Sequence, residues 1–323
     1  MSPGETSTTS PDPSGPAAPT QLPTGVRGSG IENFPVLSPL LPVDLRPHFR
    51  RVYAYCRFID DLADEQGVDA NAREIALALL AAARKELHAG AADTSAHPLF
   101  RELGVTIREK DLPLQPFEDL IAAFEQDQRV DRYETWEQLL DYCQRSANPV
   151  GRIVLMLDGI GRGDLDHEAV RLSDLICTGL QLANHWQDVR RDLIERDRVY
   201  LPRVVCGVDA AFLRDAISTP DDSAVRLRYI RALRPLVGRT RAMFDEADSL
   251  ADRLGPRLGP VVWLFHAAGL RVLDAIEAGG CTTLWERPRV SSVDKAMMIA
   301  RVWCAKASGR FARSRSDGAR ASA

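Results

Sequence analysis

Three aspartates fall within five positions in the stretch RFIDDLADEQ, residues 57–66, directly after the apolar run VYAYC. Asp60 and Asp64 are four residues apart. On a helix this spacing places both carboxylates on one face, separated by about 6 Å along the axis. A second stretch, LQLANHWQDVRRDL at 180–193, carries Asp188 and Asp192 at the same spacing. Such a pair can either lie on a solvent-exposed helix face or bind a divalent cation.

The sequence contains two further aspartate pairs with this spacing, and their neighbours distinguish them from the first two. Asp127/Asp131 lies in EQDQRVDR, and Asp248/Asp252 lies in DEADSLADR. Because these neighbours are mostly charged or polar, we expect both pairs to lie on solvated helix faces. Neither pair is therefore predicted to bind a ligand.

The first two pairs belong instead to polar stripes on otherwise apolar helices. At about 100° per residue, the residues that share each stripe are Tyr53, Arg57, Asp60, Asp61 and Asp64, and Gln181, Asn184, Asp188 and Asp192. Facing carboxylates in a helical bundle repel unless a cation lies between them. Mg²⁺ suits the role, because it prefers oxygen ligands and shares its coordination with water and phosphates. Two polar networks that only fix helix register are the alternative. A di-iron site is excluded, because no His follows a Glu at the Glu-x-x-His spacing.

Helical periodicity dominates the chain from about residue 40 onward, and it predicts an all-α fold. The predicted helical runs are 73–87, 117–128, 136–157, 169–193, 225–254, 260–278 and 293–307. No stretch alternates with period two, so a sheet is not expected. We predict one domain of about ten helices over 31–308. Segments 1–30 and 309–323 are poor in large apolar side chains and are predicted to be disordered.

Composition narrows the class of function. The chain has 323 residues, a net charge of −4 and 45% apolar residues, so no global basic field suggests a nucleic-acid partner. We find no signal peptide and no apolar run of about 18 residues that could span a membrane. The six cysteines form no C-x-x-C pair and are expected to be core thiols in a reducing cytoplasm. The basic segment 309–322 allows weak contact with an anionic membrane surface.

Two motifs resemble those of a known family. YAYCRFIDDLADE (53–65) and LQLANHWQDVRRDLIERDRVYLP (180–202) are similar to the two aspartate-rich motifs of the squalene/phytoene synthases. These enzymes join prenyl diphosphates head to head and have the all-α isoprenoid synthase fold. YCQRSANPVG (142–151) is similar to the family's central helix, and the resemblance covers about 31–305. Together with ENFPV (32–36), the motifs are most similar to the bacterial hopanoid-pathway branch that contains hydroxysqualene synthase.

The resemblance implies a role for each matching residue around a central cavity in a single helical domain. The implied Mg²⁺ ligands are Asp60, Asp64, Asn184, Asp188 and Asp192, with Asp61 supporting them. The implied substrate contacts are Asn33, Phe34, Arg57, Arg191, Arg198 and Tyr200. The implied catalytic residues are Tyr53, Arg57, Tyr142 and Gln181. Phe34, Tyr53, Tyr142 and Trp186 are candidates to line an apolar cavity for a carbocation, and plain core packing is the alternative for each. His185 is expected to pack beside the stripe.

Two departures from the family pattern bear on the substrate. Relatives that bind a second prenyl diphosphate commonly carry Arg where this chain has Gln187, and a Ser-rich contact where it has Asn33. These losses favour a single diphosphate, although Arg190 or Arg191 could compensate. The expected reaction is the Mg²⁺-dependent conversion of presqualene diphosphate to hydroxysqualene. Presqualene diphosphate or squalene synthesis from two farnesyl diphosphates is the next alternative, followed by phytoene-type synthesis.

The hydrophobic substrate and product imply work near a membrane. We therefore expect a cytoplasmic enzyme that touches the inner face of the membrane, with neighbouring enzymes of squalene biosynthesis as candidate partners. No dinucleotide-binding G-x-G-x-x-G motif occurs, which agrees with a product that needs no reductant. A non-catalytic relative is the alternative from another class. Such a protein would be expected to lose aspartates, and both motifs here are complete.

Overall fold

The computed structural model describes residues 22–23, 40–64, 66–67, 69–161 and 166–311. Across these ranges the ordered elements are helices, and the only bridge between extended segments joins Arg132 and Val199. The prediction of an all-α fold is thus confirmed. The predictions for Asn33, Phe34 and nearly all of the two terminal segments lie outside the described residues.

The described residues form more helices than the sequence runs suggested. In chain order they are α2 (Arg46–Asp64), α3 (Ala70–Ala91), α4 (Pro98–Glu109), α5 (Gln115–Asp127), α6 (Trp136–Ser146), α7 (Asn148–Leu157), α8 (His167–Gln187), α9 (Val189–Glu195), α10 (Arg203–Cys206), α11 (Ala210–Ser218), α12 (Ser223–Glu246), α13 (Leu250–Ala278) and α14 (Ser292–Ala307).

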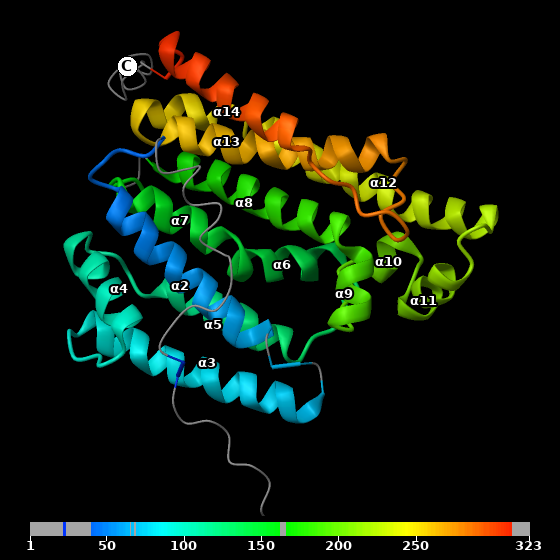
Figure 1. The fold of residues 1–323 in the computed structure, drawn as a ribbon, viewed down its shortest axis with the longest axis horizontal. Coiled ribbons are helices and arrows are strands. Elements are labelled where there is room, and N and C mark those ends of the chain that lie inside the picture. The colour runs from blue at the N-terminus through cyan, green and yellow to red at the C-terminus, as the bar shows by residue number, and fades with distance from the viewer. Residues whose placement is uncertain (1–21, 24–39, 65, 68, 162–165, 312–323) are drawn as a thin grey trace, which may run out of the picture.

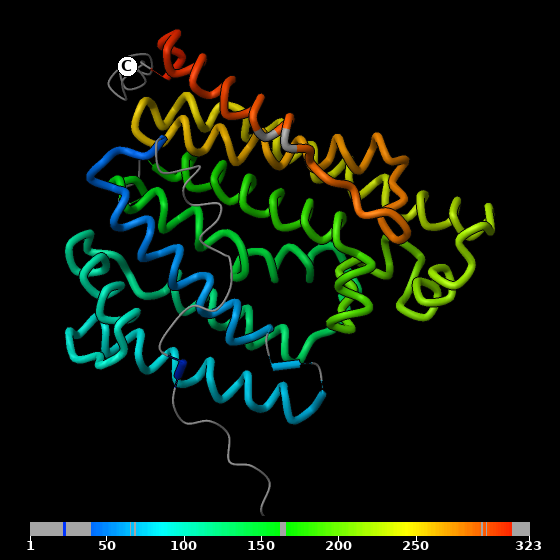
Figure 2. Tube along the Cα trace, in the orientation of Figure 1, coloured from blue at the N-terminus to red at the C-terminus, as the bar shows by residue number. Residues whose placement is uncertain are grey.

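The helices form three groups stacked on one another (Figure 1). Helices α2–α5 lie on one side, α12–α14 on the other, and α6–α9 between them, as the chain trace in Figure 2 shows. Helix α8 is central, because it packs against α6, α7, α12 and α13. Its buried residues include Leu182, Ala183 and Trp186, which fix this helix in the core. The opposite face of α8 is left for polar side chains.

Local signals set the ends of the helices around the site. Thr135 caps α6, accepting a hydrogen bond from the Gln138 backbone N–H, while the Gln138 side chain bonds back to the cap. Pro149 lies in the first turn of α7, where its missing N–H costs no helical hydrogen bond. The chain therefore breaks between α6 and α7 at Ala147, and Tyr142 lies in the last turns of α6.

The predicted single helix over 169–193 is wrong. Asp188 has φ −106° and ψ 16°, and it ends α8 and begins α9. Neither Pro nor Gly is present to signal this break. The Asp188 carboxylate instead pairs with Arg191 on α9 and with Arg287 from the connection after α13. Contacts from distant parts of the chain thus accompany the change of direction between α8 and α9.

The ordered chain continues past the predicted boundary at 308. Arg310 Nε lies 3.1 Å from Asp252 Oδ1, and Phe311 is buried near Gly259. These two residues pack on α13. The six cysteines are free, but Cys304 is exposed on α14 and is not a core thiol as predicted. Among the described helices, each is too short or too polar to cross a lipid bilayer.

Candidate active site

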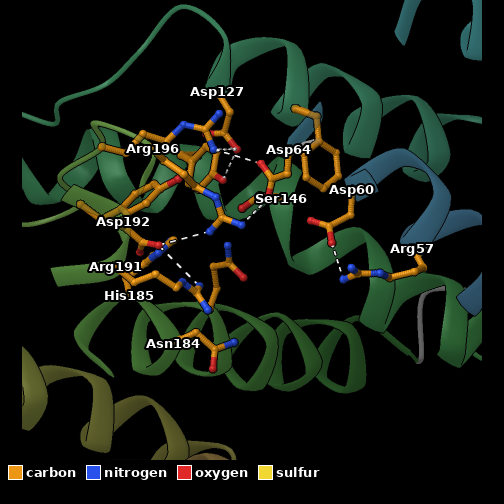
Figure 3. A pocket seen from close by; sticks show the side chains of 15 residues that line it. Arg57, Asp60, Asp64, Asp127, Ser146, Asn184, His185, Arg191, Asp192 and Arg196 are labelled. Atoms are coloured by element: carbon orange, nitrogen blue, oxygen red, sulfur yellow. Dashed lines mark hydrogen bonds and ion pairs between the residues drawn. The ribbon is translucent and has the colours of Figure 1, made fainter. Parts of the chain in front are cut away.

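A cavity of about 330 Å³ lies between the C-terminal end of α2 and the junction of α8 with α9 (Figure 3). Helices α5 and α6 and the loop after α9 complete it. The residues that line it are Arg57, Asp60, Asp64, Phe124, Asp127, Tyr142, Ser146, Gln181, Asn184, His185, Arg191, Asp192, Arg196, Arg198 and Tyr200. Most of this lining is polar, so the cavity suits a charged head group rather than a hydrocarbon chain.

The first wall is the end of α2. Arg57 reaches forward by one turn of α2, with Nη1 2.7 Å from Asp60 Oδ2 and Nη2 2.8 Å from Asp61 Oδ1. Asp60 and Asp64 line the cavity, while Asp61 is buried behind them. Burial and the nearby charge of Asp64 raise the pKa of Asp60 to about 6. An ionised Asp60 would therefore be stabilised by an added cation.

The second wall is the polar face of α8 together with α9. Gln181, Asn184 and Asp192 line the cavity on the side opposite α2. Asp192 is only 4% exposed, and this burial raises its pKa to about 6. The predicted stripe therefore holds for three of its four members, because α9 brings Asp192 back to the cavity after the break.

Asp188, the fourth member of that stripe, faces elsewhere. It does not line the first cavity but a second one of about 280 Å³. This second cavity is lined by Gln187, Asp188, Arg190, Arg191, Ile194, Glu195, Thr283 and Arg287. Asp188 pairs there with Arg191 at 2.7 Å and with Arg287. Arg191 lines both cavities, so it links Asp188 to the first one.

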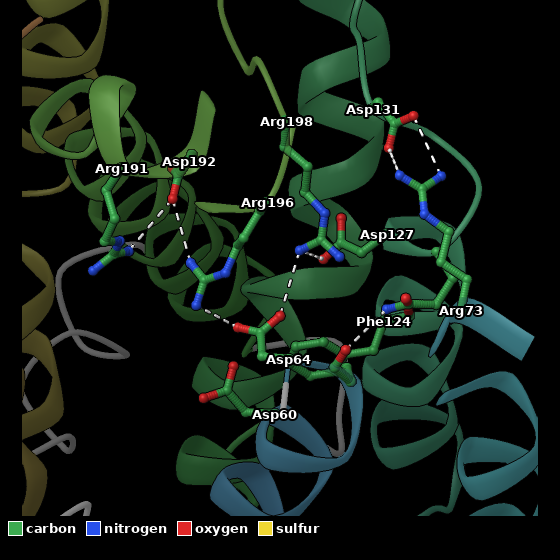
Figure 4. A network of polar contacts seen from close by, with 12 residues as sticks. Asp60, Asp64, Arg73, Phe124, Asp127, Asp131, Arg191, Asp192, Arg196 and Arg198 are labelled. Atoms are coloured by element: carbon green, nitrogen blue, oxygen red, sulfur yellow. Dashed lines mark hydrogen bonds and ion pairs between the residues drawn. The ribbon is translucent and has the colours of Figure 1, made fainter. Parts of the chain in front are cut away.

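Arg196 joins the two walls of the first cavity (Figure 4). Its Nη2 lies 2.6 Å from Asp64 Oδ2, and its Nη1 lies 3.3 Å from Asp192 Oδ1. Arg198 approaches Asp64 from the same loop, at 3.5 Å. Asp197 between them has φ 51° and pairs with Arg132 and Arg214 outside the cavity. This local conformation directs the two arginines inward.

The prediction that Asp127 lies on a solvated face is wrong. Asp127 is 4% exposed, lines the cavity, and accepts a hydrogen bond of 2.9 Å from the Tyr142 hydroxyl. Its partner in the supposed pair, Asp131, is half-buried and bonds to Arg73. Burial raises the pKa of Asp127 to about 7, against the lowering influence of Arg198. The other pair expected to be solvated, Asp248 and Asp252, is exposed, and Asp252 pairs with Arg310.

Aromatic rings form one side of the cavity. Tyr200 stacks on His185 at 3.6 Å between ring centroids, and Tyr142 lies 5.8 Å from Tyr200. Burial and neighbouring arginines lower the pKa of His185 to about 3, so its ring is neutral. Trp186 is instead a core residue whose Nε1 donates to Thr240 Oγ1 at 2.8 Å. Tyr53 is not among the lining residues.

The charges and the unpartnered polar atoms of the lining residues indicate that the first cavity binds a ligand together with a counter-ion of opposite charge. The lining contains Arg57, Arg191, Arg196 and Arg198 and, opposing them, Asp60, Asp64, Asp127 and Asp192. Five polar atoms of lining residues are buried without a hydrogen-bond partner in the described chain: Arg57 Nε, Asp127 Oδ1, Ser146 Oγ, His185 Nε2 and Arg191 Nε. Buried polar atoms rarely remain unpartnered, so their concentration here indicates a ligand or water site.

Several residues around the two cavities escaped prediction from the sequence. Arg196 and Ser146 lie within the motifs at 180–202 and 142–151, but neither was assigned a role, and Arg287 lies in no motif. Asp127 did have a signal, because Leu120 and Phe124 precede it by seven and three residues. That spacing continues the buried face of α5. Gln187 stands where relatives that bind a second diphosphate carry Arg, and its side chain donates to the Pro288 carbonyl at 2.7 Å. It lines the second cavity together with three arginines.

This chain is similar to proteins of the squalene/phytoene synthase family. A family model described as squalene/phytoene synthase matches residues 29–294. A hydroxysqualene synthase of Rhodopseudomonas palustris is 33% identical over 247 residues, covering 76% of this chain and 80% of the relative. One from Sinorhizobium fredii is 30% identical over 223 residues, covering 69% and 71%. The crystal structure of squalene synthase HpnC from Alicyclobacillus acidocaldarius aligns with a TM-score of 0.63 and 42% identity, covering 77% of this chain and 89% of that one.

Proposed function

This chain belongs to the squalene/phytoene synthase family and has the isoprenoid synthase fold, and from that premise we propose that it converts presqualene diphosphate to hydroxysqualene with the help of Mg²⁺. The observation that carries the proposal is the first cavity, whose two carboxylate walls face each other with four arginines between and beside them. Two relatives named hydroxysqualene synthase, at 30% and 33% identity, support the choice of reaction.

The donor set of the cavity fits Mg²⁺. Asp60, Asp64, Asn184 and Asp192 present oxygen ligands from both walls, which is the chemistry that this ion prefers. No three His, Cys, Asp or Glu side chains in the described ranges lie close enough together to hold a metal ion alone. Mg²⁺ bound through one or two carboxylates and substrate phosphates needs no such cluster. Asp188 would join the set from the neighbouring cavity once its carboxylate leaves Arg287.

The chain's own residues would bind and orient the diphosphate. Mg²⁺, when bound, neutralises charge on the leaving diphosphate and so favours its departure. Arg57, Arg191 and Arg198 can donate to the diphosphate oxygens, because a guanidinium presents several N–H groups in a fixed fork. The equal numbers of lining arginines and aspartates mean that an anion entering without cations would leave an excess of negative charge.

The departure of diphosphate leaves a cyclopropylcarbinyl cation beside the aromatic side of the cavity. The ring faces of Tyr142 and Tyr200 can stabilise such a cation. The lining is polar, and the Gln181 amide and the Tyr142 hydroxyl could hydrogen-bond a water in the cavity. Capture of that water by the rearranged cation gives an alcohol without a reductant.

The second cavity favours one alternative. Arg190, Arg191 and Arg287 surround Gln187, so the loss of Arg at position 187 does not remove positive charge from this side. A second diphosphate could bind there, and the enzyme would then act on two farnesyl diphosphates as a presqualene diphosphate or squalene synthase. The structural relative titled squalene synthase, at 42% identity, points the same way.

The outer face of α14 supports contact with a membrane. Val293, Met297 and Trp303 are 67%, 48% and 44% exposed, and their positions fall within an arc of about 120°. Lys306 lies over the Trp303 ring at 5.5 Å, and Arg301 is exposed beside them. An apolar face flanked by cations is typical of helices that lie on anionic bilayers. We therefore propose that the enzyme works at such a surface, where its hydrophobic substrate and product reside.

Product identification tests the proposed reaction. Purified protein and Mg²⁺ would be incubated separately with presqualene diphosphate and with farnesyl diphosphate, and the products identified by mass spectrometry. Hydroxysqualene from presqualene diphosphate alone supports the proposal. Product from farnesyl diphosphate alone would favour the two-substrate alternative instead.

A further inference from the structure

Asp127 is a buried acid, and one of its two carboxylate oxygens has no hydrogen-bond partner in the described chain. One carboxylate oxygen, Oδ2, accepts the Tyr142 hydroxyl at 2.9 Å and lies 3.9 Å from Arg198 Nη1. The other, Oδ1, is buried without a hydrogen-bond partner in the described chain. Figure 4 shows Asp127 beside Arg198, whose Nη1 also lies 3.5 Å from Asp64 Oδ1, while Arg196 pairs with Asp64 and Asp192 and not with Asp127. An ionised carboxylate buried in this way stabilises any proton delivered to it.

We propose that Asp127 is the final acceptor of the proton released when water captures the carbocation, and that the Tyr142 hydroxyl relays this proton; the inference rests on the proposed function. The water oxygen forms the new C–O bond, and one of its O–H bonds breaks. That proton passes to Tyr142 Oη, while the hydroxyl proton of Tyr142 passes to Asp127 Oδ2. Tyr142 stays neutral, Asp127 becomes a carboxylic acid, and the product is an alcohol.

The direction of the Tyr142 hydrogen bond supports this relay. Because the hydroxyl already donates to Asp127, its oxygen lone pairs remain available to accept from a water in the cavity. Tyr142 is 3% exposed and lines the cavity, so that water would lie beside the departing diphosphate. Tyr142 alone could not keep the proton, since the pKa of its hydroxyl is raised by burial and by the charge of Asp127.

Other groups in the cavity are less suited to accept the proton. Asp64 and Asp192 are paired with Arg196, and His185 is a weak base with a pKa of about 3. The pKa of Asp127, about 7, matches the value at which a general base works best near neutral pH. The charged and titratable groups that face Asp127 are Arg198, Arg196, Asp64, Tyr133, Tyr142 and Tyr200. The released diphosphate is the competing acceptor.

The test is Asp127→Asn, which keeps the side-chain size and the acceptor for Tyr142 but cannot take up a proton. Single-turnover reactions with presqualene diphosphate would measure released diphosphate and hydroxysqualene separately. We expect the ratio of hydroxysqualene to diphosphate to fall by about a hundredfold, the loss typical of a missing proton acceptor. Tyr142→Phe should give the same fall, and the double variant should add little to it. Asp131→Asn, four residues on and outside the cavity, is the matched control.

A pH profile separates proton transfer from a merely structural role. In the wild type the hydroxysqualene fraction should drop as pH falls below about 7, where Asp127 becomes protonated. In Asp127→Asn it should be flat, and Asp127→Glu should recover part of the wild-type profile. An unchanged ratio and profile in Asp127→Asn would overturn the proposal and leave diphosphate as the base. If the wild type itself makes no hydroxysqualene from presqualene diphosphate, the proposed function fails, and the relay fails with it.

Discussion

Arg196 holds Asp64 of α2 and Asp192 of α9 on a single guanidinium, at 2.6 Å and 3.3 Å, and so joins the two walls of the cavity. Two carboxylates that face each other need a positive charge between them. In this chain the protein supplies that charge itself. An incoming divalent cation would compete with Arg196 for the same two carboxylates, and the displaced guanidinium could then donate to diphosphate.

Replacing Arg196 should therefore change metal binding and stability in opposite directions. In Arg196→Met, Mg²⁺ should bind the free enzyme about tenfold more tightly, a gain of about 1.4 kcal/mol, because its competitor is gone. The melting temperature without Mg²⁺ should fall, because Asp64 and Asp192 lose their counter-ion. Titration calorimetry and thermal unfolding measure the two effects.

Arg171→Met serves as the control for that experiment. Arg171 is exposed near the start of α8, pairs with Glu168 and Glu246, and lines neither of the two cavities. Its replacement should leave Mg²⁺ affinity unchanged. Weaker Mg²⁺ binding in Arg196→Met than in the wild type would show that Arg196 supports the metal rather than competes with it.

The aspartates that line the first cavity should be essential for activity, whereas those of the exposed pair with the same spacing, Asp248 and Asp252, should not be. Asp60→Asn and Asp192→Asn should each lower kcat by about a thousandfold, because each removes an anionic oxygen ligand and the charge that holds the metal. Asp252→Asn, from the exposed pair of equal spacing, should retain wild-type kcat. Steady-state release of diphosphate provides the measurement. Equal losses in all three variants would mean that spacing, not position in the cavity, governs activity.

The sequence was sufficient to locate both walls because regular helices preserve the spacing of their residues. Asp60 and Asp64 on α2, and Gln181 and Asn184 on α8, face one cavity as the helical arcs implied. The all-α fold followed for the same reason, since apolar periodicity is a local property. Residues whose position depends on a single regular helix were thus predictable.

Most of the predictions that failed concern residues whose positions depend on contacts between distant segments of the chain. Asp188 left its stripe at a break that neither Gly nor Pro announces, where Arg287 from 99 residues further on pairs with it. Arg196 reaches Asp64 from a loop, and no spacing relates the two. Asp127 was misjudged for another reason, because its charged neighbours were weighed more heavily than its place on the buried face of α5.

The stability of the metal-free protein should fall as pH rises through neutrality. The folded-state pKa of Asp127, about 7, lies above the unfolded value of 3.8, so the folded state binds the extra proton. The stability that this proton contributes is complete below about pH 4 and is lost as pH rises through about 7. Urea unfolding of the wild type between about pH 5 and pH 8 should show the decline, and Asp127→Asn should show a smaller one. An equal decline in both proteins would contradict this assignment.

The exposed face of α14 should govern binding to anionic lipid. Sedimentation with vesicles that contain phosphatidylglycerol should recover the wild type, and vesicles of phosphatidylcholine should recover less. Trp303→Ser and Met297→Ser should reduce recovery, because each removes apolar surface from the face that would enter the bilayer. Val204→Ser changes a more exposed apolar residue on α10 and should have no effect. Equal binding by all variants would exclude α14 as the contact.

The source of the product oxygen tests the central claim most directly. Wild-type protein, Mg²⁺ and presqualene diphosphate would be incubated in water enriched in ¹⁸O, and the product analysed by mass spectrometry. We predict hydroxysqualene that carries ¹⁸O at its hydroxyl group, because water captures the cation after diphosphate has left. Recovery of unreacted presqualene diphosphate, or of an unlabelled alcohol, would contradict the proposed reaction.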